Sequence, residues 1–368
     1  MGVSQIDAGA LAADLPVFDL LVDARSPAEY AEDHLPGAVN WPVLDDEQRR
    51  VVGTLYKQVG ALEARKLGAV LASRNIASHL ETQLADKPRD WRPLVYCWRG
   101  GQRSGSLALV LGQIGFRTGQ LAGGYKAFRA VVREQLASLP AAFAWQVLCG
   151  RTGSAKTRLL QALAAEGAQT LDLEGLARHR GSVLGGLPGD PQPAQKAFET
   201  ALWSALRGLD PARPVFIESE SVRIGRLQVP EALIDAIRRD GRCLRVEMAL
   251  PARVDFLMQD YGYFVRDPEG FCDQLDALVP LRGRETVTGW QDAARRGDWP
   301  ACLGGLLAGH YDPLYDRSIR KHYAGYDQAV GVELPDASPA SLQQAARNLC
   351  KAAPPALPAA AEAAPDLP

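Results

Sequence analysis

A short apolar run that ends in a cysteine and a loop of glycines and arginines constrains the fold of this chain most. Residues 94–104 read Leu-Val-Tyr-Cys-Trp-Arg-Gly-Gly-Gln-Arg-Ser, and an apolar helical pattern begins at Leu107. The apolar run predicts a buried strand, the glycines predict a tight turn, and the pattern that follows predicts a helix. Because similar strand-like and helix-like segments alternate along the first 135 or so residues, the sequence predicts an α/β fold with a parallel sheet.

The loop after this strand has the composition of a reactive thiol site. Cys97 lies close to Arg99 and Arg103 and to the start of the predicted helix, and both surroundings lower the pKa of a thiol. Gly100 and Gly101 let successive amides point at a bound anion. A free cysteine is more often a small buried hydrophobe, but a core cysteine gains nothing from these neighbours. We therefore predict that Cys97 is a nucleophile and that these four residues hold an anionic group.

A second loop, 53 residues further along the chain, resembles a phosphate-binding loop. The apolar run 145–149 leads into Gly-Arg-Thr-Gly-Ser-Ala-Lys-Thr, and an apolar helical pattern follows. This nearly matches G-x-x-x-x-G-K-[ST], whose amides and lysine hold phosphate oxygens and whose hydroxyl can reach Mg²⁺. Ala155 replaces the last glycine of the motif, while Gly153 keeps the loop flexible. The predicted diphosphate ligands are Gly150, Thr152, Gly153, Ser154, Lys156 and Thr157.

Acidic residues follow another predicted strand of the second half. The apolar run 215–217 ends in Glu218-Ser219-Glu220, a place where nucleotide-binding folds often carry a metal-facing carboxylate. Glu218 is therefore a candidate for an Mg²⁺-facing or base role, and an acid that faces solvent is the equally open alternative. Residues 171–174, followed by 179–182, also place polar groups after a predicted strand, near the same edge of the sheet. The segment 310–316 has an unusual composition, but spacing alone gives it no role.

A chain of 368 residues is too long for a single core. We predict an α/β domain with the Cys97 loop over residues 1–139 and a doubly wound domain with the phosphate loop over residues 140–351. Residues 352–368 are almost only alanine, proline and acids, a composition that cannot bury a core and predicts disorder.

Bulk properties exclude several classes of protein. A net charge of −2 gives no global sign of nucleic-acid binding, so a polyanionic partner would need a local basic face. No apolar run approaches the roughly 20 residues of a membrane span, and the start of the chain lacks the pattern of a signal peptide, so we expect a cytoplasmic protein. The six cysteines are scattered without metal-ligand spacing, so we expect no structural metal and no disulfide framework.

Several segments resemble known families. Residues 23–30 and 34–40 resemble the two structural signatures of the rhodanese family, and Cys97 stands where that family forms its persulfide. Taken together with the phosphate loop, the segments 96–104, 172–182 and 310–313 resemble the tRNA 2-selenouridine synthase family. This second resemblance covers roughly residues 5–345. It implies a rhodanese-like parallel-sheet domain followed by a P-loop-type domain.

The resemblance also implies an activity, namely conversion of 2-thiouridine at the wobble position of tRNA into 2-selenouridine with selenophosphate as selenium donor. An S-geranyl-2-thiouridine intermediate, made with geranyl diphosphate, is implied as well, because alkylation turns a poor sulfur leaving group into a good one. Cys97 would then carry selenium as a selenopersulfide, Arg99 and Arg103 would bind selenophosphate, and Lys156 and Thr157 would bind the diphosphate. No prosthetic group is implied, and Mg²⁺ is a candidate ion.

Two other functions remain open on the sequence. The chain could be a generic rhodanese-type sulfurtransferase that uses a Cys97 persulfide and couples it to a nucleotide-binding P-loop domain. It could also be a catalytically idle nucleotide sensor, although an intact reactive cysteine loop counts against that function.

Overall fold

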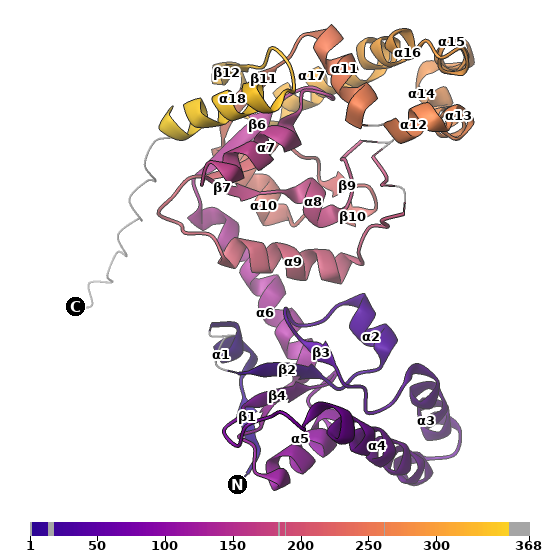
Figure 1. Ribbon diagram of the computed structural model, residues 1–368, viewed down its shortest axis with the longest axis vertical. Coiled ribbons are helices and arrows are strands. Elements are labelled where there is room, and N and C mark those ends of the chain that lie inside the picture. The colour runs from indigo at the N-terminus through magenta and orange to yellow at the C-terminus, as the bar shows by residue number, and fades with distance from the viewer. Residues whose placement is uncertain (1, 14–17, 183–184, 188, 261, 353–368) are drawn as a thin grey trace, which may run out of the picture. The chain divides into compact units, whose positions relative to one another are not determined.

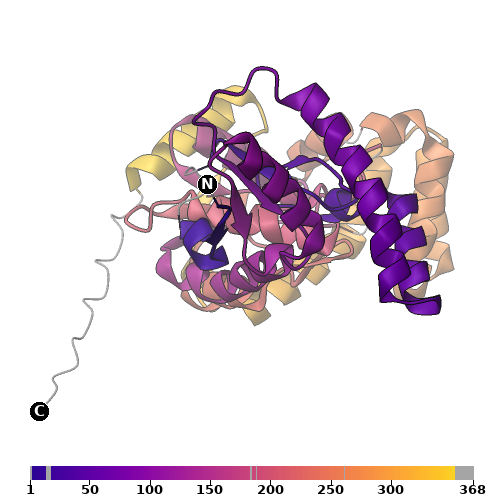
Figure 2. The same ribbon diagram turned by 90° about the horizontal axis from the view of Figure 1, so that it is seen from below.

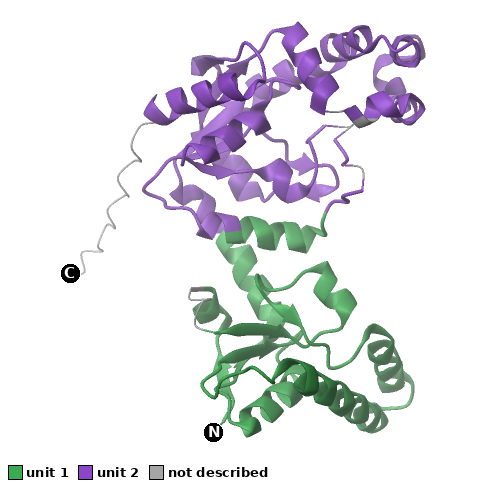
Figure 3. Ribbon diagram, in the orientation of Figure 1, with its two compact units in different colours: residues 1–136, 193–204 green, residues 137–192, 205–368 purple. Residues whose placement is uncertain are grey.

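The computed structural model describes residues 2–13, 18–182, 185–187, 189–260 and 262–352. The chain divides into two compact units (Figure 3). Unit 1 comprises residues 1–136 and 193–204, and unit 2 comprises residues 137–192 and 205–368. Of the tail for which disorder is predicted, Ala352 is the last residue of a helix, and residues 353–368 lie outside the described part of the chain.

Unit 1 contains a five-stranded parallel sheet in the order β1-β5-β4-β2-β3. The strands are β1 (Ser4–Ile6), β2 (Leu20–Asp23), β3 (Val39–Asn40), β4 (Pro93–Tyr96) and β5 (Gly119–Leu121). Helices α4 (Ala61–Gln83) and α5 (Gln102–Ile114) supply Ile76 and Leu107 to the core on one side of the sheet. Helix α6 (Gly124–Ser138) lies on the other side (Figure 1). Strand β4, which precedes the Cys97 loop, is thus central and buried.

Short helices follow the remaining strands of unit 1. Helix α1 spans Ala8–Ala13, and α2 (Pro27–Glu32) begins with a proline at its first position. Asp45 caps α3 (Asp46–Gln58) by accepting a hydrogen bond from the Gln48 amide at 2.7 Å. Figure 2 shows α3 and α4 packed side by side. Residues 195–204 of unit 1 form most of helix α9 (Gln195–Arg207), whose Trp203 packs edge-on against Phe128 of α6 at 5.4 Å between ring centres.

Unit 2 contains a second parallel sheet, in the order β12-β11-β6-β8-β7. The strands are β6 (Trp145–Cys149), β7 (Gln169–Leu171), β8 (Val215–Glu218), β11 (Arg242–Glu247) and β12 (Val330–Glu333), with a separate hairpin of β9 (Arg223–Ile224) and β10 (Leu227–Gln228). Helices α7 (Lys156–Ala165) and α18 (Pro339–Ala352) cover one face, while α10 (Glu231–Asp235) and η3 (Ala236–Asp240) lie on the other (Figure 1). The phosphate loop therefore leaves the central strand of the sheet.

A helical segment is inserted between β11 and β12. It comprises α11 (Leu250–Asp260), α12 (Gly262–Arg266), α13 (Pro268–Leu275), η4 (Asp276–Leu278), α14 (Val279–Arg282), α15 (Arg284–Arg295), α16 (Trp299–Leu306), η5 (Leu307–Tyr311) and α17 (Asp312–His322). Phe271, Trp290 and Trp299 form the centre of its own apolar core. Shorter elements elsewhere in unit 2 are η2 (Leu139–Ala142), α8 (Leu173–Ala177) and η6 (Tyr326–Gln328).

Two parallel sheets interleaved with helices confirm the predicted α/β fold class. Strand β11 ends at Glu247, and Leu250 already begins α11. The edge strands β1 and β12 were not predicted, since each is short and carries exposed polar residues. None of the helices in the described ranges combines the length and the apolar character that a membrane span requires.

Candidate active site

The Cys97 loop joins the carboxyl end of β4 to the start of α5. Cys97 directly follows the strand and is 3% exposed, and Gly101 is the residue before the helix. Gly100 has φ +66°, and a Cβ built there would lie 2.6 Å from the Leu121 carbonyl oxygen. The loop is thus wound tightly against the turn after β5, and only a glycine fits at this position.

Two polar side chains that the sequence analysis did not single out contact the loop. The Ser104 hydroxyl lies 3.1 Å from the Cys97 sulfur and can donate a hydrogen bond to it. Gln120 of β5 donates to the Ser104 hydroxyl at 3.0 Å and to the Gly100 carbonyl at 2.9 Å. Ser104 thus places a hydroxyl donor next to the sulfur, which is compatible with the nucleophilic role predicted for Cys97.

The two arginines of the loop lie in different surroundings. Arg99 is exposed at the surface, where it is accessible to an anion. Arg103 forms an ion pair with Glu29 of α2 at 2.6 Å, and Glu29 also pairs with Arg49. Burial raises the pKa of Glu29, but these two cations outweigh it and hold that pKa below its ordinary value. The guanidinium of Arg103 is therefore held in position by the Glu29 carboxylate.

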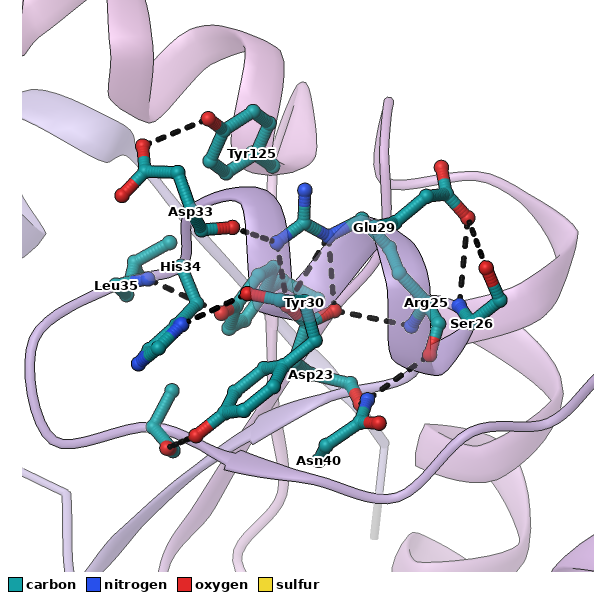
Figure 4. A network of polar contacts seen from close by, with 12 residues as sticks. Asp23, Arg25, Ser26, Glu29, Tyr30, Asp33, His34, Leu35, Asn40 and Tyr125 are labelled. Carbon is teal, nitrogen blue, oxygen red and sulfur yellow. Dashed lines mark hydrogen bonds and ion pairs between the residues drawn. The ribbon is translucent and has the colours of Figure 1, made fainter. Parts of the chain in front are cut away.

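A buried polar network lies beside the loop (Figure 4). Asp23, at the end of β2, binds the Arg25 guanidinium through both carboxylate oxygens, with the shortest distance 2.6 Å. The Arg25 guanidinium also donates to the Asp33 carbonyl and stacks 3.9 Å from the centre of the Tyr125 ring. Tyr125 in turn donates its hydroxyl to the Asp33 carboxyl, and its amide donates to the Cys97 carbonyl at 2.8 Å. The network thus fixes the backbone at the base of the reactive loop.

Gly124 is the closest backbone neighbour of the loop, and its replacement is expected to disturb Cys97. A Cβ at position 124 would lie 2.3 Å from the Cys97 carbonyl oxygen and 2.4 Å from the Gly100 nitrogen, so one backbone must shift. We expect Gly124→Ala to slow alkylation of Cys97 about tenfold or more and to lower the free energy of unfolding by a few kcal/mol. Peptide mass spectrometry after timed iodoacetamide treatment measures the first effect, and urea unfolding measures the second.

The matched control is Gly37→Ala. Gly37 has a similar left-handed backbone, φ +76°, but a Cβ there meets nothing within 4 Å. Its replacement should cost about 1 kcal/mol through backbone strain alone and leave Cys97 reactivity unchanged. Equal alkylation rates in the two variants would contradict the positioning role of Gly124.

The predicted phosphate loop follows β6 and ends at the start of α7. Lys156 is the first residue of the helix, and its ammonium donates to the Gly150 carbonyl at 2.6 Å. The Thr157 hydroxyl donates to the Glu174 carboxylate at 2.9 Å. Ser154 is almost fully buried, and no partner for its hydroxyl is found among the described residues. The structure thus gathers the predicted loop residues around one turn, as a phosphate-binding loop requires.

The substitution at position 155 has a visible consequence. Ala155 adopts the left-handed conformation, φ 57° and ψ 28°, that the glycine of the usual motif adopts without strain. Its methyl group packs into the apolar core formed by α7, α18 and the sheet. The loop geometry is therefore kept despite the departure from the motif.

A cavity of about 800 Å³ opens beside the phosphate loop, and we call it the phosphate-loop cavity. One part of its lining is polar and comes from the loop itself and from the ends of β7 and β8. Another part is apolar or aromatic and comes from α11 and from the end of η5 with α17: Phe256, Leu257, Tyr311, Leu314, Tyr315 and Ile319. The cavity can therefore accommodate an anionic group joined to an apolar one.

Acidic side chains meet next to this loop. Glu174 and Glu220 line the cavity, whereas Glu218 is fully buried and neither of its carboxyl oxygens has a partner among the described residues. Burial, reinforced by the neighbouring acids, raises the pKa of Glu218 well above its ordinary value. This placement excludes the alternative in which Glu218 faces solvent. No group of three or more His, Cys, Asp or Glu side chains in the described ranges is arranged to hold a metal ion.

A buried arginine braces the phosphate loop from α11. Arg253, 2% exposed, donates to the Thr152 carbonyl through Nε at 2.9 Å and through Nη2 at 2.7 Å. The same guanidinium binds both carboxylate oxygens of Asp312, the first residue of α17, at 2.9 and 2.6 Å. A second, more exposed pair joins Arg151 to Asp316 one turn further along. The spacing of segment 310–316 predicted no role for it. In the structure, its Asp312 and Asp316 help to hold the phosphate loop in place.

We expect Asp312→Asn to destabilise unit 2 strongly. Removing its charge leaves the buried Arg253 without a counter-ion, which costs about 3–5 kcal/mol in comparable buried pairs. The control, Asp316→Asn, breaks a pair whose side chains are 49% and 39% exposed and should cost about 1 kcal/mol or less. Urea unfolding of both variants measures the difference, and equal losses would show that Arg253 does not depend on Asp312.

Comparison with known proteins places both units in families. Residues 7–131 match the rhodanese-like domain, and residues 143–277 match a domain described as the tRNA 2-selenouridine synthase AAA domain. These matches confirm the rhodanese-like and P-loop-type domains that the resemblance implied.

Three relatives are each named tRNA 2-selenouridine synthase. The protein of Alcanivorax borkumensis is 38% identical over 82% of this chain and 90% of its own length. That of Hydrogenovibrio crunogenus is 36% identical over 83% and 91%, and that of Nitrosomonas europaea is 35% identical over 71% and 67%. With this identity over nearly the full length of two relatives, the chain belongs to the tRNA 2-selenouridine synthase family.

Proposed function

We propose that this chain converts 2-thiouridine at the wobble position of tRNA into 2-selenouridine in two steps. In the first step, the sulfur of 2-thiouridine displaces diphosphate from geranyl diphosphate at the phosphate loop. In the second step, selenium from selenophosphate replaces the geranylated sulfur with the help of Cys97. Family membership supports the overall conversion, and the separate sites support its division into two steps.

The composition of the phosphate-loop cavity is the observation that carries the geranyl step. Its polar part contains Lys156 and the loop, which fit a diphosphate, and its apolar wall of Leu257, Leu314 and Ile319 fits a hydrocarbon chain. Mg²⁺ stays a candidate ion, since the Thr157 hydroxyl and the Glu174 carboxylate are oxygen ligands of the kind it prefers.

In unit 1, the proposed roles follow the chemistry of the loop. The selenium of selenophosphate is at the selenide level, so it can form the C2–Se bond as the C2–S bond to the geranyl thiol breaks, while water takes up the phosphoryl group. Cys97 is the nucleophile that assists this transfer, Arg99 attracts the selenophosphate anion, and Gly100 and Gly101 let the backbone approach it. Arg103 contributes positive charge while its pairing with Glu29 holds it in place. The Ser104 hydroxyl can donate a hydrogen bond to the Cys97 sulfur, which is compatible with Cys97 acting as the nucleophile.

Mass spectrometry of the wobble nucleoside tests the proposal. Thiolated tRNA is incubated with the full chain, selenophosphate and geranyl diphosphate, and samples are taken over time. We expect S-geranyl-2-thiouridine to rise and fall before 2-selenouridine accumulates, and we expect no selenation when geranyl diphosphate is omitted. Selenation without geranyl diphosphate would refute the intermediate. Thiocyanate formation from cyanide without any change in tRNA would favour the generic sulfurtransferase.

A further inference from the structure

A tRNA substrate requires positive charge at the place where its modified base enters the protein. The whole chain carries a net charge of −2, so this positive charge has to be gathered locally. In the proposed function, on which this inference rests, the thiolated base meets the geranyl donor in the phosphate-loop cavity. The phosphodiesters on either side of that base must then lie against the lining or the mouth of the cavity, and groups that bind them would hold the base in place.

Two arginines that line this cavity converge on one carboxylate. Arg158 of α7 donates to Asp260, the last residue of α11, at 2.9 Å. Arg180, which follows α8, forms an ion pair with the other oxygen of the same carboxylate and donates to the Asp260 carbonyl at 3.0 Å. All three residues line the cavity, and we call Arg158 and Arg180 the arginine pair. One negative charge is thus shared between two guanidiniums, and the carboxylate fixes both of them in position.

Other arginines of the lining are engaged differently. Arg178 pairs with Asp190 at 3.3 Å, and the Arg238 guanidinium lies 5.8 Å from the centre of the Tyr323 ring. Acidic residues line the cavity as well, namely Asp172, Glu174 and Glu220. A further anion is therefore favoured only where positive charge is locally in excess, as it is where two guanidiniums face one carboxylate.

The position of Arg158 is unfavourable for the helix that carries it. The first turn of α7 holds Lys156 and Arg158 and no acidic residue. A cation is unfavourable there, because the aligned peptide dipoles give the start of a helix a partial positive charge. The Arg158 side chain is 55% exposed, and an ion pair as exposed as this adds little to stability. An anionic ligand would account for a second cation at this turn.

We propose that the arginine pair binds a phosphodiester of the tRNA next to the wobble nucleoside, while the base reaches into the phosphate-loop cavity. A guanidinium carries several N–H donors in a planar fork that fits phosphate oxygens, and the bond from Arg158 to Asp260 uses one of them. Asp260 orients both guanidiniums before the tRNA binds, so less side-chain entropy is lost on binding. This contact positions the tRNA backbone and does not read the base.

Equilibrium binding of thiolated tRNA to the full chain, measured by filter retention over a series of KCl concentrations, tests the proposal. We expect Arg158→Gln to weaken binding about tenfold at low salt, since one charge-assisted contact is lost. The slope of log K against log [KCl] should become shallower by about 0.7, the contribution of one phosphate in a single-stranded nucleic acid. The Kd for geranyl diphosphate and the midpoint of thermal unfolding should stay as in the wild type.

A conservative variant separates charge from geometry. Arg158→Lys keeps the positive charge without the planar fork, so it should keep the wild-type salt slope and recover part of the affinity for tRNA. Phosphate-ethylation interference identifies the bound group. In the wild type, ethylation next to the wobble nucleoside should weaken binding, and in Arg158→Gln this interference alone should disappear.

The matched control is Arg347→Gln. Arg347 of α18 pairs with Glu166 at the other end of α7, an ion pair of comparable exposure, and it is not among the described residues that line the cavity. This variant should bind tRNA with the wild-type affinity and salt slope. An equal loss in Arg347→Gln and Arg158→Gln would overturn the proposal, because any surface arginine would then have the same effect.

The remaining outcomes separate this inference from the proposed function. Wild-type affinity and salt slope in Arg158→Gln would overturn the phosphodiester contact. A weaker Kd for geranyl diphosphate with unchanged tRNA binding would also overturn it, because Arg158 would then hold the diphosphate of the donor. A lower unfolding midpoint as the sole change would show that the ion pair is only structural. Absence of any geranyl product with the wild type would remove the geranyl step, whereas the binding and interference measurements decide the phosphodiester contact independently.

Discussion

Replacing Cys97 with serine is expected to abolish selenium transfer and to leave geranyl transfer intact. Serine keeps the size of the side chain and can still bond to Ser104, so the loop should stay folded. Its hydroxyl, however, is not ionised at neutral pH and is a far weaker nucleophile than a thiolate. Since Cys97 belongs to unit 1 and the phosphate loop to unit 2, only one step should be lost.

Nucleoside mass spectrometry measures both steps of the Cys97→Ser variant in one reaction. S-geranyl-2-thiouridine should accumulate, because its formation continues while its consumption stops. Cys350→Ser provides the matched control, since that thiol belongs to α18 of unit 2 and is part of neither loop. If both products disappear while the variant remains folded, the division of labour between the units is wrong.

Replacing Lys156 with alanine is expected to suppress geranyl transfer first. Its ammonium lies at the start of α7, where it donates to the Gly150 carbonyl at 2.6 Å and lies 5.9 Å from the centre of the Tyr315 ring. When the C1–O bond of the geranyl donor breaks, negative charge builds up on the diphosphate, and the fixed cation stabilises it. Removal of one such group costs about 10²- to 10³-fold in rate.

The matched control for Lys156→Ala is Lys321→Ala, which removes an exposed lysine from the last turn of α17 in the same unit. The control should retain the wild-type rate of geranyl transfer. Selenation of tRNA that already carries S-geranyl-2-thiouridine should also continue in Lys156→Ala, because that step no longer needs the diphosphate donor. Unchanged geranyl transfer in Lys156→Ala would refute the diphosphate assignment.

Local patterns predicted the two loops well because each loop is encoded by neighbouring residues. A strand, a glycine turn and a helix start follow one another within about a dozen positions, both at Cys97 and at Gly150. The same pattern predicted that a helix begins near Lys156 and Thr157, and α7 begins at Lys156. The α/β fold class followed from the repetition of this unit.

The partners of those loops could not be predicted, because they come from distant parts of the chain. Arg103 was expected to bind an anion, and its ion pair with Glu29 joins residues 74 positions apart. Thr152 is held by Arg253, 101 positions away, and Arg253 by Asp312. Glu174 and Glu220 likewise approach the same point beside Gly181 because β7 and β8 are neighbours, which periodicity alone does not reveal.

The left-handed alanine in the phosphate loop bears on how the loop binds its ligand. An alanine in this conformation costs roughly 1 kcal/mol in the folded state, a cost that a glycine would avoid. However, the methyl group of Ala155 packs in the core, so the loop without ligand samples fewer backbone conformations than a loop with glycine at this position would. The conformational entropy that a flexible loop would lose on binding a ligand is thus already lost on folding, so a ligand of this loop should bind more tightly than it would to a glycine loop.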